Sequence, residues 1–127
     1  MTKDRFRFRI PITNLDGVFD RFIFCDVYHE PIHFIGSAIF LTPEQCTGLK
    51  DKNGRLIYEG DIVKRHSKYS EDEKDVVLQV EWNRKGARYI TTDKKHDSWI
   101  FSMFDYEYEI LGNIHETPEM LEVNNGK

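Results

Sequence analysis

Apolar residues in this chain come in short runs, and turn-forming residues interrupt each run before it reaches the length of an ordinary helix. Residues 5–10 alternate arginine with apolar side chains, which is the period of a β-strand with one buried and one solvated face. Residues 76–82 alternate in the same way, with Gln79 and Glu81 on the polar face and a buried face made of Val76, Leu78, Val80 and Trp82. The pattern predicts a mainly β fold.

Further strands are expected at 18–28, 32–41, 62–64, 87–92, 98–104 and 106–111, with one helical turn at 42–45. Thr117 fits an N-cap and Pro118 a first helical position, so we expect a short C-terminal helix at 118–122. Many short strands joined by tight turns are typical of a small barrel or sandwich. From about residue 47 onward, the succession of hairpins favours an SH3-like barrel.

The length of 127 residues is enough for one domain with its own core and too short for two ordinary ones. We therefore predict a single domain over residues 1–127. Within it we expect an N-terminal β segment at 1–46, a barrel core with the short helix at 47–122, and a tail at 123–127.

Glycine and asparagine residues predict where the chain reverses. Asn53-Gly54 is the pair most typical of a type I′ hairpin turn, whose two central residues both need positive φ, so 49–52 and 55–58 become the expected arms. Gly60 predicts a second reversal. The other expected turn residues are Gly48, Asp61, Gly112 and Asn113. Backbone N–H groups near the turns are expected to donate to the carboxylates of Asp51, Glu59 and Asp61.

Charge and cysteine content exclude several functional classes. A net charge of −4 and a pI near 5.7 oppose a broadly basic surface for phosphate backbones. Cys25 and Cys46 form no CxxC pair, and the chain has neither a signal-like segment nor an apolar run of about 20 residues. We therefore expect a cytoplasmic protein with no membrane association and no disulfide framework.

Residues 29–33, His-Glu-Pro-Ile-His, match the letters of the zinc-protease motif but not its mechanics. That motif needs two histidines one helical turn apart, and Pro31 disfavours a helix there. In a strand, residues four apart are separated by roughly 13 Å, which is too far for one zinc ion. We interpret the segment as a turn with two incidental histidines.

Other catalytic and metal-binding patterns are equally weak. In a calcium-loop register around Asp51, Leu49 and Gly60 take positions that need carboxylates. Cys25 and Cys46 lie among apolar residues, as small buried side chains do, and not beside groups that activate a thiolate. No nucleophile elbow or phosphate-binding glycine loop occurs. We therefore predict no catalytic residue, no metal, no cofactor and no enzymatic activity.

The N-terminal arginines allow two interpretations. Arg5, Arg7 and Arg9, interleaved with Phe6 and Phe8, resemble single-strand nucleic-acid binders, which offer cations to phosphates and rings to bases. Alternatively, the segment is an edge strand whose phenylalanines are core and whose arginines prevent pairing with other chains. We favour the edge strand because the chain is acidic overall. A second, acidic stripe is expected on the surface at Asp105, Glu107 and Glu109.

Two long stretches, residues 47–63 and residues 111–121, resemble a known family. Residues 47–54 read TGLKDKNG and 57–63 read IYEGDIV, and residues 111–121 read LGNIHETPEML. Together they resemble the YopX family of phage and prophage proteins, whose members typically read TGLKDKNG, IYEGDIV and IGNIYENPELL. His115 and Thr117 replace the usual tyrosine and asparagine, and residues 6–9 lack the tryptophan of the usual KFRAW. The resemblance implies a mostly β phage or prophage gene product and carries over no catalytic residue.

These observations favour a non-enzymatic binding module that acts on a host or phage macromolecule and associates with itself through the arginine and acidic stripes. Two alternatives remain open. One is a phage protein that binds or sequesters a nucleotide in a pocket between subunits, using arginine or lysine for phosphate and aromatic rings for the base. The other is a weak single-stranded nucleic-acid binder that uses Arg5, Arg7 and Arg9.

Overall fold

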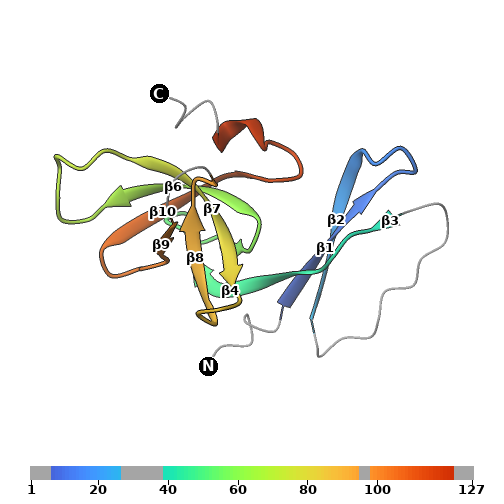
Figure 1. Cartoon of the computed structure of the whole chain (residues 1–127), viewed down its shortest axis with the longest axis horizontal. Coiled ribbons are helices and arrows are strands. Elements are labelled where there is room, and N and C mark those ends of the chain that lie inside the picture. Colours follow the sequence, from blue (N-terminus) through green and yellow to red (C-terminus); the bar gives the residue numbers. More distant parts are fainter. Residues whose placement is uncertain (1–6, 27–38, 95–97, 122–127) are drawn as a thin grey trace.

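The computed structural model describes residues 7–26, 39–94 and 98–121, and it confirms a mainly β fold (Figure 1). The chain forms two five-stranded sheets. In chain order the strands are β1 (Arg7–Thr13), β2 (Phe19–Asp26), β3 (Ile39–Phe40), β4 (Glu44–Lys50), β5 (Leu56–Tyr58), β6 (Asp61–Ser67), β7 (Val76–Asn83), β8 (Arg88–Thr92), β9 (Ser98–Ile100) and β10 (Tyr106–Asn113).

The first sheet contains the N-terminal hairpin, which consists of β1, β2 and the turn between them. Its strand order is β2-β1-β4-β5, and β3 also pairs with β1. The register places Arg9 between Phe24 of β2 and Glu44 of β4. The predicted edge strand is therefore wrong, because β1 has a bonded neighbour on each side.

The two faces of β1 are not used as the alternation predicted. Arg9 is only 5% exposed, whereas Phe8, on the opposite face, is half-buried. The arginine face is turned inward, because Arg9 bonds to side chains of β4 and β6. Arg7 is exposed, and Arg5 lies outside the described residues. A buried guanidinium needs partners for its charge. Arg9 therefore marks where the N-terminal hairpin joins the second sheet, to which β6 belongs.

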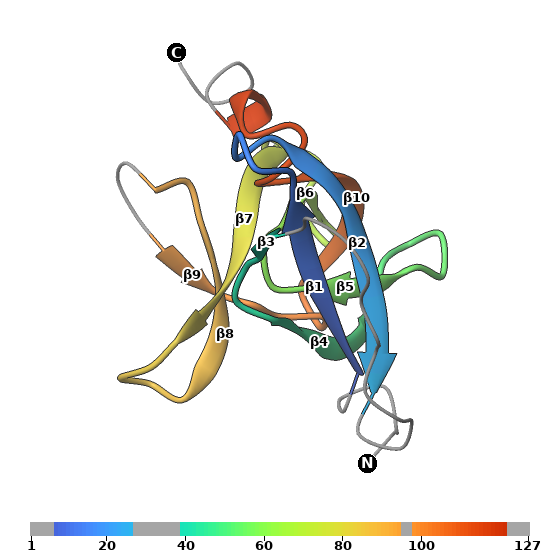
Figure 2. The same cartoon turned by 90° about the vertical axis from the view of Figure 1, so that its right-hand side faces the viewer.

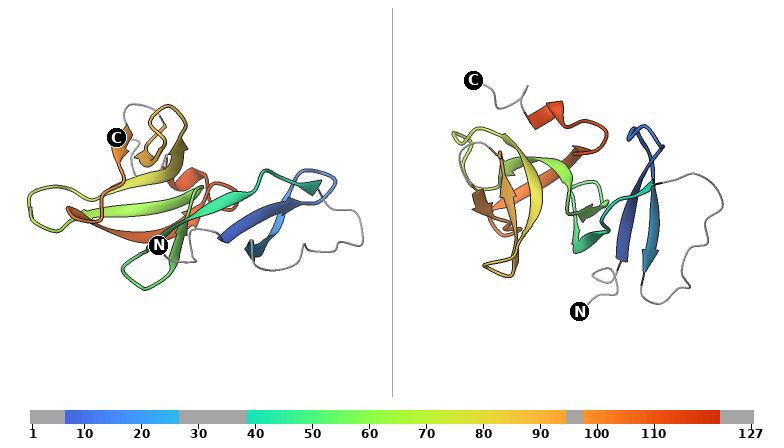
Figure 3. Two further views of the ribbon diagram at one scale, coloured as in Figure 1. Left: turned by 90° about the horizontal axis from the view of Figure 1, so that it is seen from below. Right: turned by 45° about the vertical axis from the view of Figure 1, so that its right-hand side comes forward.

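Strand β4 runs from the N-terminal hairpin to the side of the molecule that holds the second sheet, as the view from below shows (Figure 3). Its first residues pair with β1, and further along Cys46 and Lys50 pair with Tyr58 and Leu56 of β5. The helical turn predicted at 42–45 is wrong, because residues 44 and 45 are already paired in the sheet. One continuous strand thus leads from the N-terminal hairpin to β5, whose Ile57 packs in the core with residues of the second sheet.

The second sheet has the order β10-β6-β7-β8-β9 and curls into a half-barrel. Its core is a cluster of Ile57, Val63, Val80 and Tyr108, all fully buried. Phe101 packs against this cluster, with its ring centroid 4.8 Å from that of Tyr108. This curled sheet forms one side of the molecule and the N-terminal hairpin the other.

Strand β7 follows the predicted alternation only in part. Leu78 and Val80 are fully buried as expected, but Val77 and Gln79 on the opposite face are also buried, and Trp82 is 43% exposed. The reason is that β7 is a central strand, covered on both faces at its middle and open at its end. Strand β9 is shorter than the predicted 98–104.

The turn at Asn53-Gly54 forms a hairpin, but not of the predicted type. Gly54 has a φ of +84°, whereas Asn53 is not among the described residues with positive φ. The Gly54 N–H donates to the Asp51 carbonyl (3.0 Å), and the Asp51 N–H donates to that of Arg55 (2.8 Å). This is a three-residue loop with glycine in the left-handed position. The Asp51 carboxylate favours it by accepting from the Asn53 and Arg55 N–H groups.

The described part of the C-terminal helix is residues 119–121, which confirms a short helix near the predicted place. Thr117, expected as its N-cap, uses its hydroxyl to bond the backbone of Asn113 at the end of β10. Within the described ranges, no helix is long and apolar enough to span a membrane. The predicted strand at 32–38 and the His29–His33 motif lie outside the described residues.

Candidate functional site

The centre of the candidate site is the buried guanidinium of Arg9, which joins three strands. Its Nε donates to Oε1 of Glu44 on β4 (2.8 Å), and its Nη1 donates to Oδ1 of Asp61 on β6 (2.7 Å). Its Nη2 donates to the carbonyl of Glu59 (3.2 Å). Arg9, Glu44 and Asp61 are 5%, 8% and 3% exposed. Two carboxylates and one carbonyl therefore compensate this buried charge.

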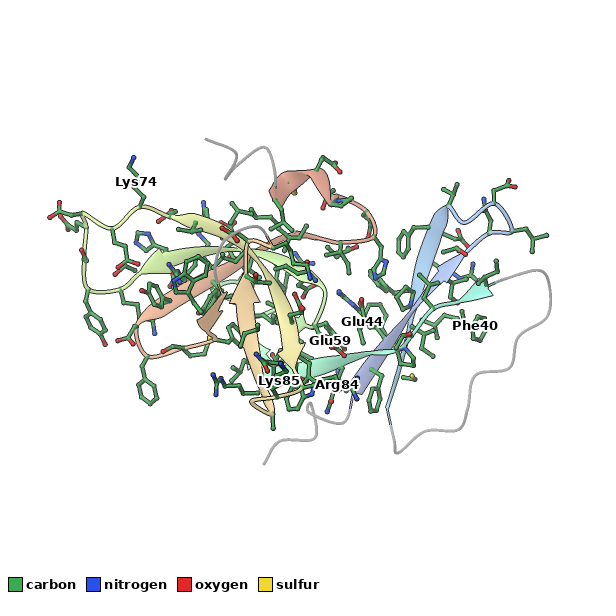
Figure 4. The ribbon with its side chains drawn as sticks, viewed as in Figure 1. Phe40, Glu44, Glu59, Lys74, Arg84 and Lys85 are labelled. Atoms are coloured by element: carbon green, nitrogen blue, oxygen red, sulfur yellow. The ribbon has the colours of Figure 1, made fainter. Side chains whose placement is uncertain are left out.

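Aromatic side chains enclose the same group. The Arg9 Cζ lies 4.2 Å from the ring centroid of Phe22 and 5.0 Å from that of Tyr58, a cation–π arrangement. His115 approaches Glu44 from the far side, with its Nε2 2.8 Å from Oε2. We call Arg9, Glu44, Asp61 and His115 the Arg9 cluster. Glu44 and Glu59 lie between the curled sheet and the N-terminal hairpin (Figure 4).

Local turn chemistry places the members of the Arg9 cluster. Asp61 Oδ2 accepts from the Tyr58 N–H (2.8 Å), which fixes the carboxylate after β5. Gly60 has a φ of +91°, and its backbone bonds both to Val80 O and to the Ile114 N–H. The segments 57–63 and 111–121, far apart in the sequence, therefore meet beside Arg9.

Burial sets the acidity of the groups in this region. It raises the pKa of Asp61 above 3.8, although Arg9 opposes the shift. Burial likewise raises the pKa of the Glu59 carboxyl, which accepts a hydrogen bond from the Gln45 N–H. All four oxygens of Glu44 and Asp61 already have partners. Neither acid has an open position for proton transfer to a substrate, so the Arg9 cluster is suited to holding structure.

An open groove lies beside the Arg9 cluster, between the N-terminal hairpin and the β4–β5 turn. Its volume is about 570 Å³. Three cations line it from two sides, Arg7 on β1 and Lys50 and Arg55 at the β4–β5 turn, and Phe24 and Tyr58 add rings. Within the described part of the chain, Lys50 and Arg55 make no ion pair. The groove is therefore a cationic and aromatic surface, and Asp61, the acid among its described lining residues, is already bound to Arg9.

A second cavity, of about 390 Å³, lies on the other side of Glu44 and has the opposite charge. Glu44, Glu59 and Glu81 line it together with His115. Across residues 7–26, 39–94 and 98–121, no three histidine, cysteine or acidic side chains are arranged to hold a metal ion. Each of these acids already has a donor within the chain, and we assign them no ligand. The donors are Arg9 for Glu44, the Gln45 N–H for Glu59 and the Lys94 amine for Glu81.

Arg65 is a second buried arginine with a different environment. Its Cζ lies 4.2 Å from the ring centroid of Tyr106 and 5.2 Å from that of Trp99. Its Nε and Nη1 are closed to solvent and make no hydrogen bond to the described part of the chain. The rings and Glu73, whose Oε2 lies 3.7 Å from Nη2, stabilise the charge. Because Nε and Nη1 are closed to solvent, they are not open to a ligand, and the candidate site stays beside Arg9.

The residues singled out in the sequence are dispersed in the structure. Arg7 lines the groove, Arg9 is buried, and Glu109 lies 3.6 and 3.4 Å from the Lys52 and Lys64 amines. Asp105 and Glu107 are exposed, and the thiols of Cys25 and Cys46 are unbridged. Positive φ angles occur at Gly48 and at the turn glycines Gly54 and Gly60. Gly112 lies within β10 at an irregularity of its pairing with β6, and Asn113 ends that strand.

No sequence pattern predicts that Glu44, His115 and Phe22 are neighbours of Arg9. They lie 35, 106 and 13 residues after Arg9, and nothing in their local sequence marks them as its neighbours. The only available signal was the resemblance motif that contains His115.

Asp51 ties the β4–β5 turn to β10 and gives the fold a pH-dependent contact. Burial alone would raise the pKa of Asp51, but the N–H groups of Ile110, Arg55 and Asn53 hold it below 3.8. Between the lowered folded pKa and the unfolded one, the unfolded chain binds more protons. The stabilisation is therefore complete above the unfolded pKa and is lost as the pH falls through the folded one.

Replacing Asp51 with asparagine is expected to lower the free energy of unfolding at pH 7 by about 1–3 kcal/mol, because at least one buried N–H loses its acceptor. The deficit should shrink as the pH falls below 3.8, since Asp51 itself then becomes protonated. Urea unfolding at pH 7 and pH 3 measures this. Asp72→Asn, in an exposed loop, should show little effect at either pH. An equal Asp51→Asn deficit at both pH values would contradict the assignment.

A protein-family model described as YopX protein matches residues 21–122. The chain belongs to the YopX family. The match includes Glu44, Asp61 and His115 of the Arg9 cluster but begins after β1, so this YopX-family chain supplies the central arginine from outside the matched residues. No curated protein matches the sequence. Among solved structures, this YopX-family chain is similar to the crystal structure of protein EF1440 from Enterococcus faecalis, at 24% identity over 89% of this chain and 75% of that one, with a TM-score of 0.47.

Proposed function

We propose that this YopX-family chain is a non-enzymatic binding module, encoded by a bacteriophage or prophage and active in the bacterial cytosol, and that it binds an anionic partner in the groove beside the Arg9 cluster. The observation that supports this proposal is that the acids around Arg9 have partners within the chain, whereas two nearby cations have no ion-pair partner in the described residues. The acids Glu44 and Asp61 are bonded within the chain, whereas Lys50 and Arg55 face the groove without an ion pair in the described residues.

Size and electrostatics support this choice. A volume of about 570 Å³ falls in the range of small-molecule sites, roughly 300–1,000 Å³. Cations on two opposing walls raise the local potential, and the walls exclude part of the solvent that would screen it. An anionic group can therefore bind here even though the chain is acidic overall.

Binding to a second copy through the charge stripes is less favoured by the contacts. Arg9 is buried and bonded within its own chain, and Glu109 lies close to Lys52 and Lys64. Of the stripe residues that the structure describes, only Arg7, Asp105 and Glu107 remain exposed. We therefore place binding at the groove.

A titration with pyrophosphate, followed by ¹H–¹⁵N NMR, tests the proposal. We expect shifts to concentrate on the amides of Arg7, Lys50 and Arg55, and we expect Arg55→Glu to weaken binding by about tenfold, equivalent to roughly 1.4 kcal/mol. Arg84→Glu is the matched control, because Arg84 is also an exposed turn arginine but the β7–β8 turn projects to the opposite side from the β4–β5 turn (Figure 2). Equal losses in both variants, or no localised shifts, would reject the groove.

A further inference from the structure

We propose that the groove takes a nucleoside phosphate, with the base against the ring of Phe24 and the phosphate between the cations of the two walls. The inference rests on the binding role proposed above and adds the class of ligand. Its elements are one exposed aromatic face, cations within reach of it, and an acid that Arg9 has already neutralised.

Phe24 provides the stacking surface. Its side chain is 62% exposed, although it lies on the inward-facing side of β2 directly across from Arg9. Tyr58 supports it from one side in a T-shaped contact, with ring centroids 5.8 Å apart and an interplanar angle of 70°. A ring held in place by a neighbour and open to solvent is what base stacking requires, and such stacking tolerates any base.

The cations are placed for a phosphate next to that ring. Arg7 is two residues before Arg9 on β1 and therefore shares the face of the hairpin that carries Phe24. Lys50 and Arg55 approach from the other wall of the groove. The guanidinium groups can bind phosphate oxygens in pairs, and lysine adds a point charge.

Neither ionisable group at the base of the groove repels a phosphate. Asp61 forms its ion pair with Arg9 at 2.7 Å. Burial raises the pKa of Tyr58 to about 12, so its phenol is neutral at physiological pH. Among the described lining residues, the charge presented to the ligand is thus that of the wall cations.

An acidic peptide fits the groove less well. A peptide would most readily add to the free edge of β5, which ends the first sheet. The Tyr58 N–H on that edge already donates to Asp61. With this donor occupied, a short three-residue edge offers little for strand addition. The surface suits a flat ring with an attached anion better than an extended chain.

Isothermal titration with ADP, a ten-nucleotide single-stranded DNA and pyrophosphate tests the inference. We expect ADP or the oligonucleotide to bind more tightly than pyrophosphate. Phe24→Ala should weaken that tighter binding by about 5- to 150-fold and leave pyrophosphate binding unchanged, because a stacked base contributes roughly 1–3 kcal/mol. If the DNA binds more tightly than ADP, the natural ligand is a single-stranded nucleic acid. If ADP binds more tightly, the natural ligand is a free nucleotide.

Two variants control for loss of structure. Phe24→Leu keeps apolar bulk against Tyr58 but removes the flat ring, so it should weaken nucleotide binding as well. Phe104→Ala removes an 85% exposed ring elsewhere and should change nothing. Equal affinity for ADP, the DNA and pyrophosphate, or an equal effect of Phe24→Ala on all three, would overturn the nucleotide assignment while anion binding stands. Binding of none of the three would reject the proposed function itself.

Discussion

Replacing Arg9 with methionine is expected to lower the free energy of unfolding by about 3–5 kcal/mol, because removal of one partner leaves buried charges uncompensated. Glu44 and Asp61 would each lose a charged donor, at 2.8 and 2.7 Å, while their exposures are only 8% and 3%. Methionine retains much of the packing against Phe22 and Tyr58, so the loss reports the charge and not a cavity.

Equilibrium unfolding in urea measures this effect, and Arg7→Met is the matched control. Arg7 is on the same strand and the same face but is exposed, so its replacement should cost no more than about 1 kcal/mol. The Arg9→Met deficit should also shrink at acidic pH, because burial raises the pKa of Asp61 and the protonated carboxyl no longer needs a cation. A deficit equal to that of Arg7→Met would show that the Arg9 cluster does not hold the two sheets together.

Replacing Gly60 with alanine is expected to cost about 3 kcal/mol, for two reasons that add. The φ of +91° is unfavourable for any residue with a side chain. A Cβ there would also lie 2.6 Å from Oε2 of Glu44. Glu44 cannot easily withdraw, because Arg9 and His115 each hold one of its oxygens at 2.8 Å.

Gly54→Ala separates these two contributions. Its φ of +84° is nearly the same, but no atom lies within 4 Å of the added Cβ, so only the backbone strain of about 1–2 kcal/mol remains. Urea unfolding of both variants measures the difference. In a Glu44→Ala background, Gly60→Ala should cost no more than Gly54→Ala. Equal losses from the two glycine variants in the native background would refute the contact with Glu44.

The periodicity of the sequence was sufficient to predict strands but not which of their faces would be buried. Alternation identifies the two faces of β1. Because phenylalanine is usually found in cores and arginine at the surface, the face with Arg9 was predicted to be exposed, but Arg9 is buried. That preference is reversed only when partners for the charge are present, and those partners come from β4 and β6. Local sequence does not specify such distant contacts, so most of the candidate site could not be predicted from the sequence.

The turn at Asn53-Gly54 illustrates a second limit. The pair fits both a two-residue and a three-residue hairpin loop, because each needs glycine at a left-handed position. The Asp51 carboxylate selects the longer loop by bonding two N–H groups within it and that of Ile110 on β10. The strand order in the first sheet, with β1 at its centre, likewise depends on pairing between distant segments.

The spread of the Arg9 cluster along the chain also constrains how the protein assembles during synthesis. Arg9 meets Asp61 at a separation of 52 residues, and Glu44 meets His115 at a separation of 71. At typical translation rates the ribosome needs roughly 3–10 s to add the 52 residues between Arg9 and Asp61. Until then, the first hairpin has its arginine face in water and no acid from β6 to hold it. We therefore expect nascent chains that end before Asp61 to leave β1 and β2 open to proteolysis, and release of the C-terminal segment to complete the protection.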